Sequence, residues 1–560
     1  MNLFDWIVLL TTLAAIVGYG TWKTRKQQDL NSYLRGGQDA NWATVGLSVM
    51  ATQASAITFL STPGQAFESG MGFLQFYLGL PIALVILSVT VIPIFYKLNI
   101  YTAYEYLETR FDLKSRLLTA FLFLVQRGLA AGITIYAPAI VLSVVLGWDL
   151  NTMIIGIGLL VIVYTVSGGT KAVSLTQKWQ MAVIMGGMFF AFYTLIQYLA
   201  PHVSFTEALD IAAIHGKMQI INYDFDVNTR YTIWSGLTGG LFLALSYFGT
   251  DQSQVQRYIS GSDLKQSRMG LMFNAVLKIP MQFFILLTGI LVFVFYQYNN
   301  RPVHFNPIVT ETIVNSDRAE EGEELIAEFN QIQETKQELM ASKTFNDAQK
   351  LQLSAMEDAQ VEISNAYGDL AVEIDPEVET KDADYVFLRF ILDYLPHGAI
   401  GLLLAVIFSA AMSSTAGELN ALASTTMNDF VKRLRADQTE RDGDVGLSKW
   451  LTVGWGVMAI SFALYAKLVD NLIEFVNILG SVFYGTILGI FVAAFYIKAI
   501  RKNGIFVAAL ISQTFVLVLK FKTDIGYLWF NFIGCVCVIV LGLIFTQLMA
   551  ETRRKTDQTV

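Results

Sequence analysis

The residues most suggestive of chemistry lie in Gly401–Phe430, GLLLAVIFSAAMSSTAGELNALASTTMNDF, where hydroxyl side chains interrupt an apolar run. Ser409, Ser413, Ser414 and Thr415 place neutral oxygens in a segment long enough to cross a membrane. Hydroxyls suit a lipid-facing surface poorly, so we expect them to face protein or a cavity. Such oxygens are what a desolvated monovalent cation requires. The alternative is that each hydroxyl bonds back to its own helix.

Two further apolar segments contain a polar interruption. One is ATQASA at residues 51–56, and the other is LSYFGTDQ at residues 245–252. Small and hydroxylated residues at a helix midpoint allow the backbone to unwind and expose carbonyl groups to a ligand. For either segment alone, close helix packing through small residues is the alternative. Interrupted helices in corresponding positions of two five-helix halves indicate a secondary transporter built as an inverted repeat.

Composition indicates the class of protein that positions these groups. Of 560 residues, 54% are hydrophobic and 15% are charged, and the mean hydropathy is +0.49, which is typical of a membrane protein. The first apolar run lacks a basic n-region and a cleavage site, so we expect a retained helix and not a signal peptide. Apolar runs predict about 13 transmembrane helices, at residues 4–22, 42–62, 74–97, 117–147, 151–167, 176–200, 232–250, 270–298, 386–415, 449–469, 472–498, 504–520 and 526–549.

Basic residues in the short loops predict the orientation. Residues such as Arg25, Arg35, Arg110 and Arg433 all fall on one side if the N-terminus is outside and the C-terminus inside. Twelve or fourteen spans would destroy this alternation. The prediction is therefore an all-α polytopic protein that crosses the plasma (cytoplasmic) membrane many times and contacts the lipid bilayer.

An acidic segment interrupts the apolar pattern between the eighth and ninth spans. Residues 315–384 contain nineteen acidic and five basic residues, a net charge of −14 in a chain whose total is −8. Its helical periodicity predicts an external hairpin, which is either a solvated insertion or a module that binds an external partner. The apolar residues that carry this periodicity are Leu325, Phe329, Ile332 and Leu339, followed by Leu351, Ala355, Ala359 and Ile363.

Several functional classes are disfavoured. The four histidines, His202, His215, His304 and His397, fall in external loops or at span ends, so none serves a proton relay in the membrane. HExxH and GxxxxGK[ST] motifs are absent from the sequence, which disfavours a metalloprotease or an ATP-driven pump. No nucleophile–base spacing indicates an enzyme. Basic charge lies in short loops beside the membrane, and so we expect no nucleic-acid partner.

Five motifs in order resemble the sodium:solute symporter family, whose members carry sugars, proline, sialic acid, monocarboxylates, vitamins or iodide. The resemblance implies a leucine-transporter-type 5+5 inverted repeat, with spans two to six and seven to eleven as the repeats. The motifs are residues 51–56, IYTAYEYLETRF (Ile100–Phe111), YTVSGGTKAVSLTQKWQ (Tyr164–Gln180), FGTDQSQVQRYIS (Phe248–Ser260) and SAAMSSTAGELNALAS (Ser409–Ser424).

The resemblance also implies how the chain is divided. Residues 1–41 form an extra N-terminal helix and cytoplasmic loop, 42–200 the first repeat, 201–231 an external loop, 232–498 the second repeat with its acidic insert at 300–384, and 499–560 two C-terminal helices and a cytoplasmic tail.

The family's main sodium site implies five ligands here. The carbonyls of Ala51, Ala54 and Ala410 and the hydroxyls of Ser413 and Ser414 occupy the matching positions. Five neutral oxygens suit a singly charged ion, whereas a divalent ion normally recruits carboxylates.

A second sodium site, found in some family members, uses an aspartate and two hydroxyls. This chain has Gln177, Ala416 and Gly417 at those positions, which provide neither a carboxylate nor a hydroxyl. We therefore expect one sodium ion per transport cycle.

The resemblance places the solute beside the sodium site and leaves its class open. Lys278 and Thr250-Asp251-Gln252 are similar to sugar-transporting members, whereas SQVQRYIS and YAPA (Tyr136–Ala139) are similar to the monocarboxylate, vitamin and iodide branch. The solute is thus a sugar or polyol, or a small organic anion. The candidate binding residues are Gln53, Ser55, Thr58, Phe73, Gln75, Phe76, Tyr77, Arg127, Asp251, Gln252 and Lys278.

Each intramembrane charge also has a structural interpretation. Lys278 could extend to the cytoplasmic surface, Asp251 could cap a helix or pair with Lys278, and Arg127 could pair within the fold instead of meeting an anion.

The predicted function is sodium-coupled import of a small solute by alternating access. The first alternative is a proton-coupled transporter of the same fold, with Asp251 or Glu418 as the proton carrier. A non-transporting membrane sensor is a more distant alternative, because the short C-terminal tail leaves no room for a signalling module.

Overall fold

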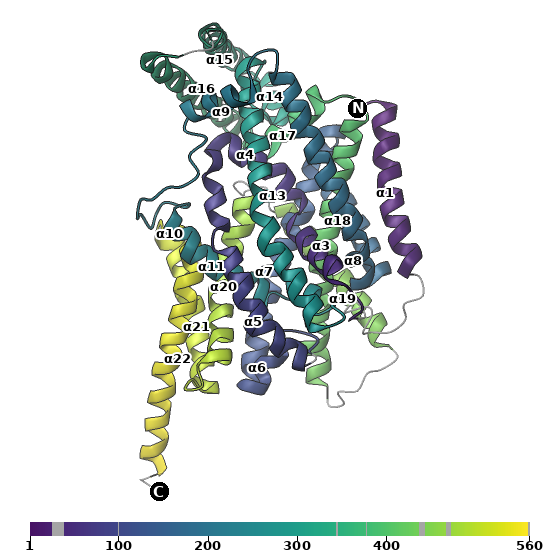
Figure 1. Ribbon diagram of the computed structural model, residues 1–560, viewed down its shortest axis with the longest axis vertical. Coiled ribbons are helices and arrows are strands. Elements are labelled where there is room, and N and C mark those ends of the chain that lie inside the picture. Colours follow the sequence, from purple (N-terminus) through teal and green to yellow (C-terminus); the bar gives the residue numbers. More distant parts are fainter. Residues whose placement is uncertain are drawn as a thin grey trace.

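The computed structural model describes residues 1–24, 38–98, 100–342, 345–376, 378–435, 443–465 and 472–557. The described residues form helices and connecting segments, with one isolated bridge between Ala40 and Gly261. Figure 1 shows long helices running side by side, with the N-terminus at the upper end and the C-terminus at the lower end. The predicted all-α class is confirmed.

The bounds of the helices are as follows. The first half contains α1 (Leu3–Thr24), α3 (Trp42–Gln53), α4 (Ala56–Ser69), η2 (Gly70–Tyr77), α5 (Leu80–Leu98), α6 (Glu105–Arg110), α7 (Leu113–Leu146), α8 (Leu150–Leu199) and α9 (Phe205–Ile214). The second half contains α10 (Ile233–Ser235), η3 (Gly236–Gly240), α11 (Leu241–Thr250), α12 (Gln252–Tyr258), α13 (Leu264–Tyr298), α14 (Pro307–Val314), α15 (Ala319–Met340), α16 (Asp347–Ile374), α17 (Ala383–Tyr394), α18 (Ala399–Thr425), η4 (Thr426–Lys432), α19 (Asp444–Tyr465), α20 (Leu472–Tyr496), α21 (Lys502–Lys522) and α22 (Leu528–Asp557).

The number of uninterrupted spans is lower than the thirteen predicted segments. Nine helices among the described residues are long and apolar enough to cross a membrane, and Leu3–Ile16 and Leu150–Val166 are shorter apolar helices. The two remaining predicted segments, 42–62 and 232–250, belong to helices that are interrupted at Ala54 and at Asp251, respectively. An interrupted helix fails a test based on continuous length although its two halves together cross the bilayer.

The first break lies between α3 and α4. Ala54 leaves the helix with φ −84° and ψ 64°, and Ser55 is extended, so α3 ends at Gln53 and α4 begins at Ala56. The carbonyl of Ala51 therefore loses its usual donor, and it accepts no backbone hydrogen bond from any described residue outside α3. The interruption predicted at residues 51–56 is confirmed.

The second break separates α11 from α12 at Asp251. This residue is extended, with φ −79° and ψ 118°, and its carboxylate accepts a hydrogen bond from the backbone amide of Ser253. The carboxylate thus satisfies one of the free amides at the start of α12. The interruption predicted near residue 250 is confirmed, and both broken helices meet inside the bundle.

Helix α8 is a single element that folds back on itself. The hydroxyls of Tyr164 and Thr176 are 2.7 Å apart, although twelve residues in a straight helix would separate their Cα atoms by about 18 Å. The chain therefore reverses between these residues, as expected for two predicted spans at 151–167 and 176–200. Arg25 and Arg35 of the first predicted cytoplasmic loop lie outside the described residues.

The predicted ninth span at residues 386–415 is wrong in its start. Residues 383–394 form the separate helix α17, and the helix that carries the hydroxyl cluster begins only at Ala399. Pro396 and Gly398 lie between the two helices, and Gly398 has a φ of +88° that favours glycine. The hydroxyl cluster therefore lies near the middle of α18 and not at its end.

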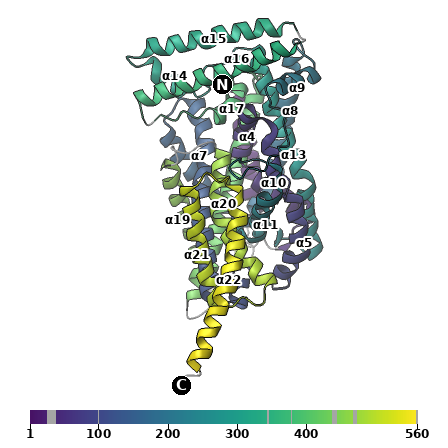
Figure 2. The same cartoon turned by 90° about the vertical axis from the view of Figure 1, so that its left-hand side faces the viewer.

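The acidic insert forms the predicted helical hairpin from α15 and α16. Figure 2 shows both helices lying across the top of the bundle, nearly perpendicular to the helices below. Phe329 and Ile363 are buried between them, but Leu351 is 73% exposed, so its place in the second apolar stripe was wrong. Glu357 forms buried ion pairs with Lys336, which joins the two helices of the hairpin, and with Arg301, which follows the end of α13. An external partner for the insert stays a prediction.

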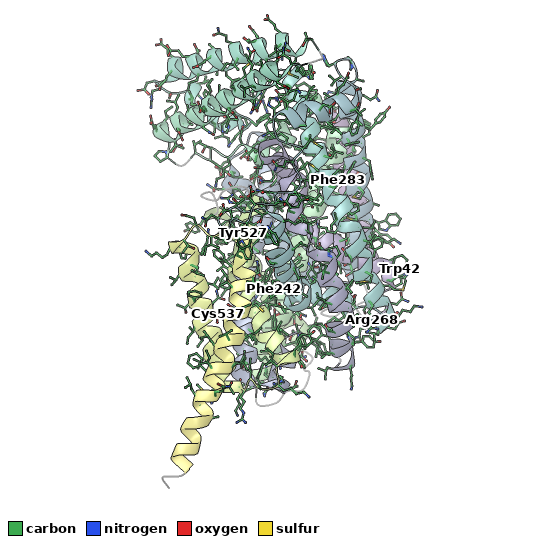
Figure 3. All side chains as sticks on the ribbon, turned by 60° about the vertical axis from the view of Figure 1, so that its left-hand side comes forward. Trp42, Phe242, Arg268, Phe283, Tyr527 and Cys537 are labelled. Carbon is green, nitrogen blue, oxygen red and sulfur yellow. The ribbon has the colours of Figure 1, made fainter. Side chains whose placement is uncertain are left out.

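The peripheral surface of the bundle is apolar. Trp42 lies at the edge in Figure 3 and packs against Phe273 with ring centroids 5.8 Å apart. Near the N-terminus, α1 packs on α18, where the carboxylate of Asp5 accepts a 2.5 Å hydrogen bond from the Gly398 amide. The helix with the hydroxyl cluster is therefore fixed at its outer end.

The segment that follows the hairpin contains a titratable contact. Burial alone would lower the pKa of His304, but the Asp382 carboxylate 3.0 Å from Nδ1 raises it more, and the net pKa lies above the usual 6.5. The backbone amide of Asn306 lies near His304 Nδ1 and also donates to the Asp382 carboxylate at 3.2 Å. When Nδ1 is protonated and can no longer accept a hydrogen bond, the amide therefore still has the Asp382 carboxylate as its acceptor.

Raising the pH should loosen this contact. Because the folded-state pKa is raised, the stabilisation is complete below pH 6.5 and is lost as the pH rises through the folded-state value. We expect protease cleavage of residues 375–382 to accelerate several-fold between pH 6 and pH 9. The His304→Gln variant should be cleaved at a rate that does not change with pH, and a wild-type rate that is constant over this range would contradict the prediction.

Candidate functional site

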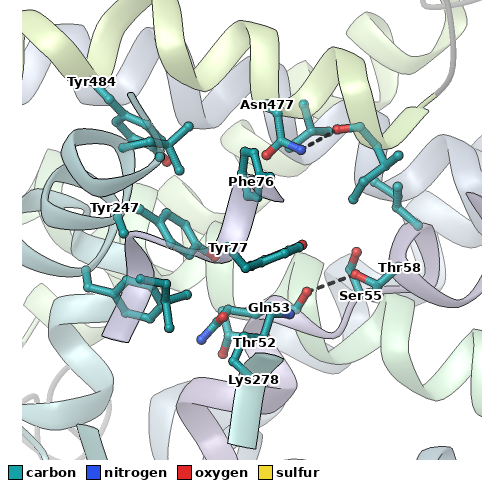
Figure 4. A pocket seen from close by; sticks show the side chains of 18 of the residues that line it. Thr52, Gln53, Ser55, Thr58, Phe76, Tyr77, Tyr247, Lys278, Asn477 and Tyr484 are labelled. Atoms are coloured by element: carbon teal, nitrogen blue, oxygen red, sulfur yellow. Dashed lines mark hydrogen bonds between the residues drawn. The ribbon is translucent and has the colours of Figure 1, made fainter. Parts of the chain in front are cut away.

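A cavity of about 110 Å³ lies between the two broken helices. Figure 4 shows aromatic rings of Phe76, Tyr77 and Tyr247 on its walls, with Lys278 and Asn477 among the polar groups. Several elements therefore meet at one chamber inside the bundle. The candidate residues that line it are Gln53, Ser55, Thr58, Phe76, Tyr77, Arg127 and Lys278.

The walls beside the first break are fixed by local hydrogen bonds. The Thr58 hydroxyl donates to the carbonyl of Gln53 at 3.0 Å, which holds the start of α4 against the end of α3. The Gln53 amide nitrogen donates to the Val49 carbonyl at 3.2 Å and lies 3.4 Å from Asn274 Oδ1. The break thus presents an ordered polar edge to the cavity.

Four candidate residues do not line this cavity. Phe73 stacks behind Phe76 with centroids 5.5 Å apart, and Gln75 accepts a bond from the Asn222 amide in an outer hollow. The side chain of Gln252 is used by the backbone at residues 101 and 103, and Asp251 is used by α12 and Arg127. These placements correct the predicted roles of Phe73, Gln75, Gln252 and Asp251 as direct contacts.

Lys278 is a buried cation that faces the cavity. Its side chain extends from α13, is 2% exposed, and places Nζ 5.3 Å from the centre of the Tyr77 ring. Lys278 makes no ion pair with any carboxylate of the described residues, so it neither pairs with Asp251 nor reaches the surface. An ammonium group in this position is available to an anionic ligand.

Arg127, by contrast, is held by protein groups at both of its terminal nitrogens. Its Nη1 donates to Glu418 at 3.0 Å, and its Nη2 contacts Asp251 and donates to the Tyr484 hydroxyl at 2.5 Å. Tyr484 in turn donates to Asp251 at 2.6 Å. The cluster joins α7, the second break, α18 and α20, so the predicted structural pairing of Arg127 describes it better than contact with an anion.

Removing the Arg127 side chain should destabilise the protein strongly. Arg127→Met leaves Asp251 and Glu418 as two buried carboxylates without a counter-charge, and breaking such a pair costs about 3–5 kcal/mol. We expect a lower Tm in detergent. Arg127→Met combined with Glu418→Gln should recover part of the loss, because one negative charge then disappears. A double variant no more stable than Arg127→Met would contradict this account of the cluster.

The five predicted sodium ligands lie where α18 crosses the first break. Ala51, Ala54, Ala410, Ser413 and Ser414 are all 1% exposed or less. The hydroxyl of Ser414 lies 3.4 Å from the carbonyl of Thr52, one of the two residues between Ala51 and Ala54. Ser414 on α18 therefore faces the break.

The chemistry of this position fits a monovalent cation. Ser413 Oγ is buried and has no hydrogen-bond partner among the described residues, so it does not bond back to its own helix as the structural alternative requires. An orphaned buried hydroxyl is costly unless it meets a ligand. With no carboxylate in the predicted set, a singly charged ion is the ligand that these oxygens suit.

The positions that lack the oxygens of a second sodium site make protein contacts. Gln177 Oε1 accepts a 2.5 Å bond from Ser48, and its amide nitrogen donates to Thr52 at 3.1 Å. A Cβ atom at Gly417 would approach the Arg257 guanidinium to 2.4 Å. Of the three predicted departures, Gln177 is therefore hydrogen-bonded within the protein and Gly417 leaves room for Arg257.

Several wall residues with polar side-chain atoms were not predicted from the sequence as solute contacts. Gln126, Tyr247, Asn477 and Tyr484 all line the cavity. Asn477 is a lone amide in the apolar stretch FVNILG, which is a signal that could have been recognised. The two tyrosines give no such signal, since aromatic residues are common throughout this chain.

The sequence matches the model of one protein family over most of its length. The model of the sodium:solute symporter family matches residues 33–321 and 367–512. The unmatched residues 322–366 all fall within the hairpin of α15 and α16.

Individual relatives give the same picture. The human sodium/iodide cotransporter is 31% identical over 52% of this chain and 46% of its own length, so the match spans less than half of that protein. Human sodium-coupled monocarboxylate transporter 2 is 26% identical over 87% of this chain and 67% of its own. The sodium/sialic acid symporter of Proteus mirabilis is 26% identical over 98% and 96%.

The fold is also shared with a solved structure. A Na⁺-coupled sialic acid symporter in a substrate-bound outward-open state superposes with a TM-score of 0.76, at 25% identity and 98% coverage of both chains. The implied leucine-transporter-type fold is confirmed by this likeness.

Proposed function

Because this chain belongs to the sodium:solute symporter family, we propose that it imports a small organic anion, of the carboxylate class, together with one sodium ion. The family places the chain among multi-pass transporters of the plasma membrane, and its relatives are transporters and not enzymes. Sodium is the coupling ion of these relatives. The proposal concerns the solute and the residues that bind it.

The single observation that carries the proposal is Lys278. It lines the cavity, is buried, and lacks a carboxylate partner among the described residues. A buried ammonium without a counter-charge is unfavourable, and an incoming carboxylate supplies that charge. The other cation on the wall, Arg127, is already neutralised by Glu418 and Asp251.

The residues around Lys278 favour a small anion with an apolar body. Phe76, Tyr77 and Tyr247 offer ring faces and edges, and Gln53 and Asn477 add amide groups. Such a wall accommodates the carbon skeleton of a carboxylate while a few polar groups set its orientation. An uncharged polyol would use the amides and leave Lys278 unpaired, which is why we favour the anion.

Sodium would support solute binding through the first break. An ion held by the carbonyls of Ala51 and Ala54 and by Ser413 fixes α3, α4 and α18 relative to one another. Gln53 and Ser55 in the same break line the solute cavity. Fixing the break therefore orders one wall of the cavity, and by linkage the solute raises sodium affinity by the same factor.

Uptake by proteoliposomes tests the function directly. With sodium outside, we expect accumulation of a short monocarboxylate, and we expect neither the matching amide nor a monosaccharide to compete with it. The sodium dependence should have a Hill coefficient near one, since one ion binds per cycle. Potassium in place of sodium is the control for leak. Competition by the sugar but not by the carboxylate would overturn the proposed solute class, and uptake driven equally well by a proton gradient in potassium would overturn sodium coupling.

A further inference from the structure

Arg257 on α12 is a buried cation that the transport site does not use. The whole side chain is 0% exposed, and it forms no ion pair with a carboxylate among the described residues. Its Nη1 donates to the Ser174 hydroxyl at 3.1 Å, whereas Nε and Nη2 have no hydrogen-bond partner in the part of the chain that the structure describes. Because an unpaired buried charge is costly, this arrangement favours any conformation in which the guanidinium meets water.

A chain of polar contacts links this guanidinium to the end of α3. Ser174 Oγ lies 3.4 Å from Ser48 Oγ, which donates to Gln177 at 2.5 Å, and Gln177 donates to Thr52 Oγ1 at 3.1 Å. We call this set the Arg257 relay. Its members are Arg257, Ser174, Ser48, Gln177 and Thr52.

The relay ends at the proposed sodium site. Thr52 lies between the two carbonyl ligands, and its own carbonyl is 3.4 Å from the Ser414 hydroxyl. When that hydroxyl turns a lone pair toward an ion, its proton needs another acceptor, and the Thr52 carbonyl is in place to receive it. Sodium therefore strengthens the hydrogen bond from Ser414 to the Thr52 carbonyl, and this bond holds the end of α3 in the position in which the Arg257 relay forms.

The same guanidinium also packs against α18. A Cβ atom at Gly417 would come within 2.4 Å of Arg257 Nη2, and Gln256 donates to the Gly417 carbonyl at 2.9 Å. Glycine at this position leaves the space that the guanidinium needs. Arg257 thus lies where α12, α8 and α18 meet, on the cytoplasmic side of the cavity.

We propose that Arg257 is a positioning residue that couples the sodium site to closure of the cytoplasmic half of the protein. The inference rests on the sodium site of the proposed function. Without sodium, the unpaired guanidinium favours separation of α12 from its neighbours and access of water. With sodium, the relay is held together and α12 stays packed.

Cysteine accessibility of the full chain in inside-out vesicles tests this coupling. Ser260→Cys reports on the end of α12, because Ser260 is 4% exposed and its hydroxyl donates to the Arg257 carbonyl at 2.6 Å. Cys535 and Cys537 are replaced by alanine in this background. We expect sodium, compared with potassium, to slow labelling by a membrane-impermeant maleimide about tenfold, a factor within the usual range of coupling between sites.

The variants separate coupling from folding. Arg257→Met should reduce the sodium effect on labelling to less than about twofold while sodium still raises the Tm. Gly417→Ala should give the same result, because its methyl group displaces the guanidinium without removing a side chain of the relay. Ser512→Cys, buried on the distant α21, is the matched control and should not respond to either variant.

The outcomes distinguish the two proposals. If both variants keep the tenfold sodium effect, the Arg257 relay is wrong even though the sodium site stands. If sodium does not raise the Tm of the unmodified protein, the sodium site itself is wrong and the relay falls with it.

Discussion

Replacing Lys278 with glutamine is expected to lower kcat/KM for a carboxylate solute about 100-fold. A hydrogen bond to a charged group contributes up to about 3 kcal/mol, and a factor of 100 corresponds to about 2.8 kcal/mol. Glutamine retains a hydrogen-bond donor one atom nearer the backbone and removes the charge. Because Lys278 lies on α13 and outside the proposed sodium ligands, sodium should stabilise the variant as it does the wild type.

Initial rates of sodium-driven uptake in proteoliposomes give this measurement. Lys265→Gln is the matched control, since it removes an exposed lysine from the first turn of the same helix and should leave uptake unchanged. Lys278→Arg keeps the charge and should retain more activity than the glutamine variant. An unchanged kcat/KM in Lys278→Gln would remove the basis for an anionic solute.

Replacing Ser413 with alanine is expected to raise the sodium concentration for half-maximal thermal stabilisation about 30-fold. The variant removes one of five proposed oxygen ligands, and a 30-fold change corresponds to about 2 kcal/mol. Folding in potassium should be little affected, because the hydroxyl has no hydrogen-bond partner among the described residues to lose. The expected signature is therefore a lost response to sodium in a protein with an ordinary Tm in KCl.

Ser409→Ala provides the comparison for this variant. Ser409 is one helical turn earlier on α18, is 1% exposed and also lacks a partner among the described residues, but it is outside the proposed ligand set. We expect its sodium response to match that of the wild type. Equal losses in both variants would assign the effect to hydroxyls of α18 in general, and a normal response in Ser413→Ala would contradict the site.

The features that sequence reasoning predicted well are local ones. The break at Ala54 follows from small and polar residues within an apolar run, and the cap at Asp251 follows from an acidic residue at a helix start. The hairpin of α15 and α16 follows from charge and periodicity. These signals need no knowledge of neighbouring elements, because the backbone responds to the residues that form it.

The features that the sequence could not provide depend on contacts between distant residues. Arg127 and Glu418 are 291 positions apart, and nothing in either motif states that they pair. Gln252 lies in a polar motif, yet its amide is used by the backbone near Tyr101. The start of α18 was predicted wrongly for a different reason. Pro396 and Gly398 are helix-breaking signals in the sequence, but the apolar pattern that continues past them was given more weight.

The charges at the cavity have an electrical consequence. Arg127 and Lys278 contribute two positive charges, and Asp251 and Glu418 contribute two negative ones, so this group is neutral without ligands. One sodium ion and one monovalent anion add charges that cancel. Membrane potential, which supplies about 2.3 kcal/mol per charge at 100 mV, would then drive neither the loaded nor the empty step. Transport would be electroneutral and would produce no net current. The sodium concentration ratio alone would then set the limit of solute accumulation.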